Sequence, residues 1–140
     1  MRSVSFAAVL VALTISSQAH ADDATVKGTF IGPGIYATAE GCKKLSSLAT
    51  GGDQNVGTVP ETLTEDGFEG WEGSCTFKSI SEVDKDKTWK AQMQCAEGPD
   101  ETEETDIFER QPDGTLKVTQ DKHVTVFQRC DDGKDAGKGK

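Results

Sequence analysis

The clearest pattern in the chain is an alternation of apolar or small residues with polar ones over residues 71–78 and 89–95. A period of two predicts β-strands with one buried face. The polar stretch between these runs predicts the turn of a hairpin centred on Lys85. In that register Phe77 lies opposite Met93, and the apolar positions of both strands share one face, as a half-buried hairpin requires.

A second hairpin is predicted from the sequence Gln-Pro-Asp-Gly-Thr at residues 111–115. Proline at the first turn position and Gly114 at a left-handed position fit a three-residue loop with a bulge. This loop places Phe108 opposite Val118, while Ile107 points to the other face of the sheet.

The last predicted strand covers residues 122–130. Val124 and Val126 alternate on the face that also carries Cys130, and Phe127 points to the opposite face. We therefore expect this strand to be covered on both sides.

The first half of the chain predicts shorter elements. Residues 25–30 and 34–37 predict two short strands separated by Gly-Pro-Gly, and apolar residues at helical spacing predict a short helix at about 40–49. Residues 61–71 predict an edge strand or a bent strand that leads into the first hairpin. The fold class is therefore mainly β: a small antiparallel meander or barrel-like sheet with one short helix.

Four cysteines add covalent links to this fold. An even number of cysteines in an exported chain predicts disulfides, and the absence of a CxxC pair argues against a zinc site. Cys75 and Cys95 face each other in the first hairpin, where a Cα separation of about 4.5 Å is within reach of a disulfide. Of the three possible connectivities we prefer Cys75–Cys95 with Cys42–Cys130, which ties the predicted helix to the last strand.

The start of the chain predicts export. Arg2, a short apolar run and a small-x-small sequence that ends at Ala21 form the pattern of a cleaved signal peptide. The apolar run falls short of the roughly 20 residues that a membrane-spanning helix needs. We expect removal of residues 1–21, a single β-rich domain over 22–130 and a disordered polar tail over 131–140, with no membrane insertion after cleavage and a periplasmic or secreted location.

The mature chain is strongly acidic. The full sequence has 15 Lys and Arg against 24 Asp and Glu, a net charge of −9, and loss of Arg2 makes it −10. Such a charge argues against binding to nucleic acids or anionic membranes. It is compatible with a cationic partner or with solubility alone, and solubility is the favoured interpretation of the charge by itself.

Catalytic motifs are missing from the sequence. It contains no Gly-x-Ser-x-Gly, no His-Glu-x-x-His, no phosphate-binding loop and no dinucleotide fingerprint. We interpret His123 as a surface histidine of a strand rather than a general base. The acidic run at residues 100–106 lacks the spacing of a calcium loop and predicts a solvated loop. The sequence thus predicts a protein that is not an enzyme, with no catalytic residues, cofactor or metal site.

The most distinctive segment has three glycines around two aromatic residues, at residues 67–75. One interpretation is a binding surface formed by Phe68, Glu69, Trp71 and Glu72. The other is a bent strand in which Trp71 plugs the end of the barrel. The second is favoured here because Trp71 shares the face of the hairpin's apolar residues.

These patterns favour a non-enzymatic module that binds a protein. In size and disulfide style the domain resembles the small β-barrel inhibitors that Gram-negative bacteria export against lysozymes or proteases, although the motifs of those inhibitors are not visible. The alternative is a small-ligand-binding barrel, with an apolar or aromatic ligand near Trp71 and Trp89. A carboxylate-based hydrolase is a less favoured third hypothesis.

Overall fold

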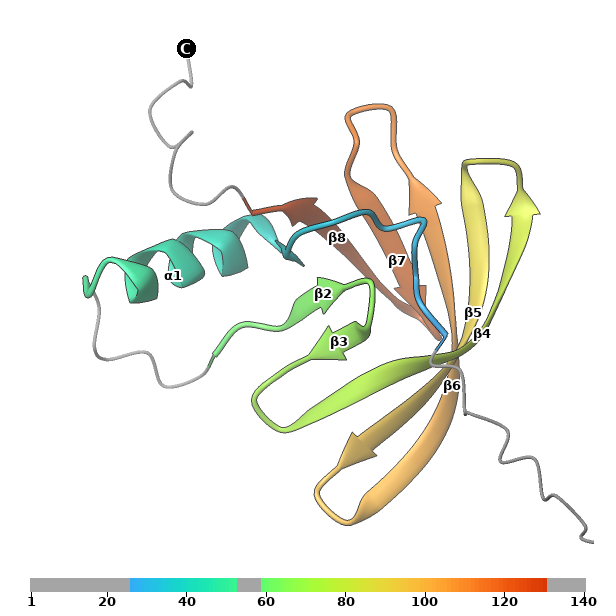
Figure 1. The fold of residues 1–140 in the computed structure, drawn as a ribbon, viewed down its shortest axis with the longest axis horizontal. Helices are drawn as coiled ribbons and strands as arrows, with labels where there is room; N and C mark the ends of the chain where they lie inside the picture. The colour runs from blue at the N-terminus through green and yellow to red at the C-terminus, as the bar shows by residue number, and fades with distance from the viewer. Residues whose placement is uncertain (1–25, 53–58, 131–140) are drawn as a thin grey trace, which may run out of the picture.

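The computed structural model of the protein describes residues 26–52 and 59–130. Eight antiparallel strands follow one another in a closed barrel, with one helix between the first two strands (Figure 1). This confirms the predicted mainly β meander with a barrel-like sheet and one short helix. The predicted signal peptide and polar tail lie outside the described residues. The elements are β1 Tyr36–Ala37, α1 Ala39–Ala49, β2 Thr62–Thr64, β3 Gly67–Glu69, β4 Gly73–Asp84, β5 Thr88–Glu97, β6 Asp100–Arg110, β7 Leu116–Gln120 and β8 His123–Arg129.

The barrel closes between its first and last strands. Tyr36 of β1 lies opposite Arg129 of β8, and Ala37 lies opposite Gln128. Strands β4, β5 and β6 have 10 to 12 residues, whereas β7 has only five. The hairpins of the long strands therefore extend past their shorter neighbours (Figure 1).

The first predicted hairpin forms with the expected pairing of Phe77 and Met93. Nearer the turn, two register shifts add one residue each to β4, so the turn centres on Asp86 rather than on Lys85. The second hairpin also has the predicted register, with Phe108 opposite Val118. The bulge at Lys78 shifts the inward positions of β4 from Phe77 to Ile80, which lies opposite buried Ala91 and packs against the core. A strict alternation does not contain this change of phase, so the predicted turn is displaced by one residue.

An aromatic cluster fills one end of the barrel. Phe30 stacks on Trp89 with ring centroids 4.6 Å apart and meets Phe108 edge-on at 5.2 Å. The segment that supplies Phe30 forms turns, so the strand predicted over residues 25–30 is wrong for its described part. Its backbone crosses the barrel end instead of extending the sheet, and buried Ile31 helps to plug that end.

The outer face of β8 differs from the prediction. Phe127 is buried in the core, but Val124 and Val126 are 59% and 49% exposed. The helix lies against the C-terminal end of β8 (Figure 1), where Cys42 is linked to Cys130. The strand is thus covered on one side only.

The helix and both bridges agree with the predictions. Thr38 caps α1, because its hydroxyl accepts a hydrogen bond from the Gly41 amide at 3.0 Å. The disulfides are Cys42–Cys130 and Cys75–Cys95, with Cα separations of 5.2 and 4.0 Å. Two disulfides indicate an oxidising compartment, outside the cell or in the periplasm. Within the described residues, no helix has the length and apolar character needed to span a membrane.

The long-range bridge has the larger expected effect on stability. Cys42 and Cys130 are 88 residues apart, against 20 for Cys75 and Cys95. On the chain-entropy description, replacing both members of the first pair by alanine lowers the free energy of unfolding by about 4–5 kcal/mol, and the second pair by about 3 kcal/mol. Urea denaturation of the two double variants measures the order, and a larger loss for the second pair would contradict it.

Gly67 is the glycine that the fold requires most strictly. Its φ is 131°, and a Cβ atom there would lie 1.9 Å from the carbonyl oxygen of Cys75 on β4. We expect Gly67→Ala to lower the free energy of unfolding by about 3 kcal/mol or more. Gly98→Ala is the matched control: φ is 58° with nothing within 4 Å, so only the backbone strain of about 1–2 kcal/mol applies. Equal losses in thermal unfolding would overturn this explanation.

Candidate functional site

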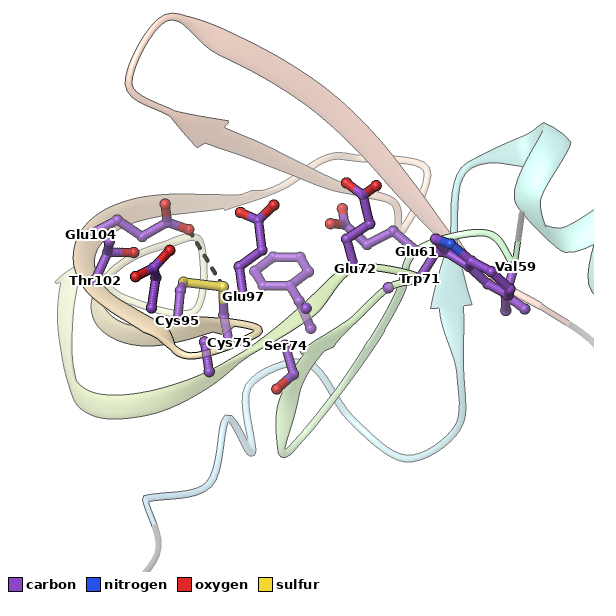
Figure 2. A pocket seen from close by; sticks show the side chains of 15 residues that line it. Val59, Glu61, Trp71, Glu72, Ser74, Cys75, Cys95, Glu97, Thr102 and Glu104 are labelled. Carbon is purple, nitrogen blue, oxygen red and sulfur yellow. Dashed lines mark hydrogen bonds between the residues drawn. A yellow bond between two sulfur atoms is a disulfide. The ribbon is translucent and has the colours of Figure 1, made fainter. Parts of the chain in front are cut away.

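The end of the barrel opposite the aromatic cluster of Phe30, Trp89 and Phe108 is open. A pocket of about 570 Å³ lies there, between the β3–β4 turn and the β5–β6 hairpin. Its lining includes buried Phe68, which lies opposite Cys75 on the neighbouring strand. The disulfide of Cys75 and Cys95 is also part of the lining (Figure 2).

Trp71 lies at the rim of this pocket, 64% exposed, so the expectation that it plugs the barrel is wrong. Trp71 and Glu72 are the two tip residues of the β3–β4 turn, which a hydrogen bond from the Gly70 amide to the Gly73 carbonyl closes at 2.9 Å. Strand β4 begins only at Gly73, so its alternation does not fix the direction of Trp71. In Figure 2, Trp71 and the disulfide lie on opposite sides of the pocket.

Negative charge dominates this opening. Its described lining includes five carboxylate side chains and no Lys, Arg or His. The pKa of Glu61 is raised by partial burial and by the negative charge of Glu104. The five acidic residues are Glu61, Glu72, Glu97, Asp100 and Glu104.

A second opening lies beside the first, where β6 runs past the end of β7. The last pair between these strands is Asp106 with Gln120. The resulting pocket of about 540 Å³ is lined by both residues, by Glu104, which also lines the first pocket, and by exposed His123. The acidic run at residues 100–106 is therefore part of a strand, and the prediction of a solvated loop is wrong.

Asp106 is a fully buried carboxylate between these openings, with 0% exposure. Its Oδ2 accepts a hydrogen bond from Gln120 Nε2 at 3.2 Å, and the same nitrogen lies 3.4 Å from Glu104 Oε1. Its Oδ1 has no hydrogen-bond partner among the described residues. Burial raises the pKa of Asp106 to about 6, and the charges of Glu104 and Glu61 add to the increase, while the hydrogen bond from Gln120 opposes it.

Glu104 also contacts the disulfide. Its Oε1 lies 3.7 Å from Cys75 Sγ (Figure 2), and a half-cystine sulfur has no proton to donate. Cys75, Cys95 and Glu104 form the only group of three or more described residues whose potential metal ligands all lie within 4.8 Å of one another. Because the two sulfurs are bonded to each other, they are not thiolates, and this group offers a metal ion only one anionic ligand.

The predicted surface residues divide between the pocket and the outside. Phe68, Trp71 and Glu72 line the pocket, Phe68 as a buried side chain, whereas exposed Glu69 is not among its lining residues. Sequence reasoning missed the inward carboxylates. Their signal was available: extending the alternation back from Phe108 places Asp106 and Glu104 on the inner face.

Comparisons of the chain with protein-family models, with curated proteins and with solved structures found no match.

Burial of Asp106 predicts a measurable pH dependence of stability. Because its folded pKa of about 6 exceeds the ordinary 3.8, the stability that protonation provides is complete below pH 3.8 and is lost as the pH rises through about 6. Asp106→Asn, which copies the neutral form, should therefore raise the free energy of unfolding by about 3 kcal/mol above pH 6 and by little in strong acid. Denaturant unfolding at both pH values tests this.

The matched control is Glu101→Gln, which removes the same charge from an exposed position on the same strand. An equal gain in stability from both variants would show that general charge reduction, and not burial of Asp106, is responsible.

Proposed function

We propose that the protein is a non-enzymatic, exported binding module that engages a basic protein through the open end of its barrel. The observation that carries this proposal is the 570 Å³ pocket with an acidic lining and Trp71 exposed at its rim. Exposed tryptophans are frequent energetic centres of protein interfaces. A concentrated negative field steers basic partners and speeds their association.

The scaffold suits such a role. Trp71 and Glu72 lie on a tight two-residue turn, and the neighbouring strands are joined by the Cys75–Cys95 disulfide. A contact surface on a constrained backbone loses little conformational entropy on binding. This rigidity supports an inhibitor-like or recognition function.

A barrel that carries an apolar ligand has less support. The two tryptophans line different pockets at opposite ends, and Trp89 is 6% exposed and stacked on Phe30. Side chains thus fill the interior around Trp89. The space at the open end is bounded by carboxylates, which suit a cation rather than an apolar molecule.

A carboxylate-based hydrolase also ranks below binding. Glu104 and Asp106 do converge, and a raised pKa suits a general acid. The two residues lie two positions apart on one strand and share a single Gln120 donor, however, so they do not flank a substrate from opposite sides as a glycoside hydrolase requires.

Substitution at the rim tests the proposed function. We expect Trp71→Ala to weaken binding to a basic protein such as a lysozyme by about tenfold or more, because an exposed aromatic anchor is lost. Biolayer interferometry or titration calorimetry measures the affinity, and enzyme inhibition is followed in parallel. The association rate should fall as salt is raised, because salt screens the acidic field.

Val124→Ala is the control, since it removes an exposed apolar side chain from the outer wall of β8. Absence of binding to lysozymes and basic proteases at micromolar concentration, or equal effects of the two substitutions, would refute the proposed function.

A further inference from the structure

We infer that Glu104 and Asp106 form a specific site for one guanidinium group, which enters between β6 and the β7–β8 turn. This inference rests on the proposed function and deepens it by naming the chemical group that the open end recognises. The group comes either from an arginine side chain of a protein partner or from a free small guanidinium compound.

The two carboxylates have too few hydrogen-bond donors around them. Gln120 Nε2 is the only described donor shared by the two carboxylates, at 3.2 and 3.4 Å. Oδ1 of Asp106 has no partner although the residue is fully buried. Buried carboxylate oxygens ordinarily accept hydrogen bonds or pair with a positive charge. This site therefore lacks a hydrogen-bond donor for Oδ1 of Asp106 and a positive charge to balance the two carboxylates.

The spacing of the carboxylates suits a guanidinium group better than a bare metal ion. The carboxylates of Glu61, Glu104 and Asp106 do not form a trio of ligand atoms within 4.8 Å, so they do not chelate a bare metal ion as they stand. A guanidinium is planar, always charged and carries five N–H donors in a rigid fork. It can bridge two separated carboxylates in the way that the neutral amide of Gln120 now does.

Access is available from the second pocket. It has a volume of about 540 Å³, and both carboxylate residues and Gln120 line it. Gln120 is partly exposed, so its side chain can swing aside and release its two hydrogen bonds to the incoming group. Asp121 adds a further negative side chain to the lining, and His123 is the one basic residue among the described residues of this pocket.

The affinity of this site for a guanidinium group should depend on pH. Glu104 and Glu61 act on Asp106 electrostatically, Gln120 donates to it, and Asp121 and His123 line the same pocket. Protonation removes the negative charge of Asp106, so guanidinium affinity should fall as the pH drops through about 6. The variant His123→Gln removes any contribution from the histidine and should keep this dependence.

The test is titration calorimetry of the full, disulfide-bonded chain with N-acetyl-arginine amide. The neutral isostere N-acetyl-citrulline amide and the equally charged N-acetyl-lysine amide are the comparison compounds. We expect the arginine compound to bind, the citrulline compound not to bind and the lysine compound to bind more weakly. Asp106→Asn and Glu104→Gln should each weaken arginine binding about tenfold or more, and Glu101→Gln should not.

The outcomes separate this inference from the proposed function. Equal binding of the citrulline compound, or unchanged affinity in Asp106→Asn, would overturn the guanidinium site even if Trp71→Ala still weakens binding to a basic protein. Competition between the arginine compound and the basic protein identifies a partner side chain as the source. If the arginine compound binds but none of the basic proteins does, the site recognises a free guanidinium compound. That result refutes the proposed function and leaves the guanidinium site standing.

Discussion

The alternation of side chains along β6 joins the core of this protein to its candidate site. Phe108 lies at the centre of the aromatic cluster with 0% exposure, and the period of two then directs Asp106 and Glu104 to the same inner face. A shift of one residue in the pairing of β6 with its neighbouring strands would turn both carboxylates and the phenyl ring of Phe108 to the outer face. The packing that holds Phe108 inside therefore also directs the side chains of Glu104 and Asp106 inward, and in this chain both are acidic.

The two ends of the barrel respond differently to this constraint. At one end Phe30 and Ile31 cover the interior, and the strand partners of Phe108 are apolar. At the other end β6 outruns β7, so the inward residues beyond Asp106 face open pockets instead of a closed core. The unfavourable free energy of burying charge is thus confined to the open end, where the Cys75–Cys95 disulfide joins two strands, while the aromatic cluster stabilises the other end.

Sequence reasoning predicted the parts of the fold that follow from local alternation and turn chemistry. The register of Phe77 with Met93 and of Phe108 with Val118, the short helix and both disulfides could all be derived in this way. The prediction of a solvated loop at residues 100–106, which depends on polar composition, is wrong. Residues 100–106 form a strand because β5 supplies hydrogen bonds along their whole length, a tertiary effect that composition does not contain.

The candidate site was harder to predict for the same reason. The position of Trp71 fits the alternation of β4 and so predicts a buried side chain, but β4 begins only at Gly73. Glu61 approaches Glu104 from a distant part of the chain, which local sequence does not reveal. A buried charge without a partner is unfavourable for folding, and neutral side chains of similar size are available at such a position. Retaining one beside an open pocket is therefore better explained by a ligand that supplies the missing charge than by the needs of the fold.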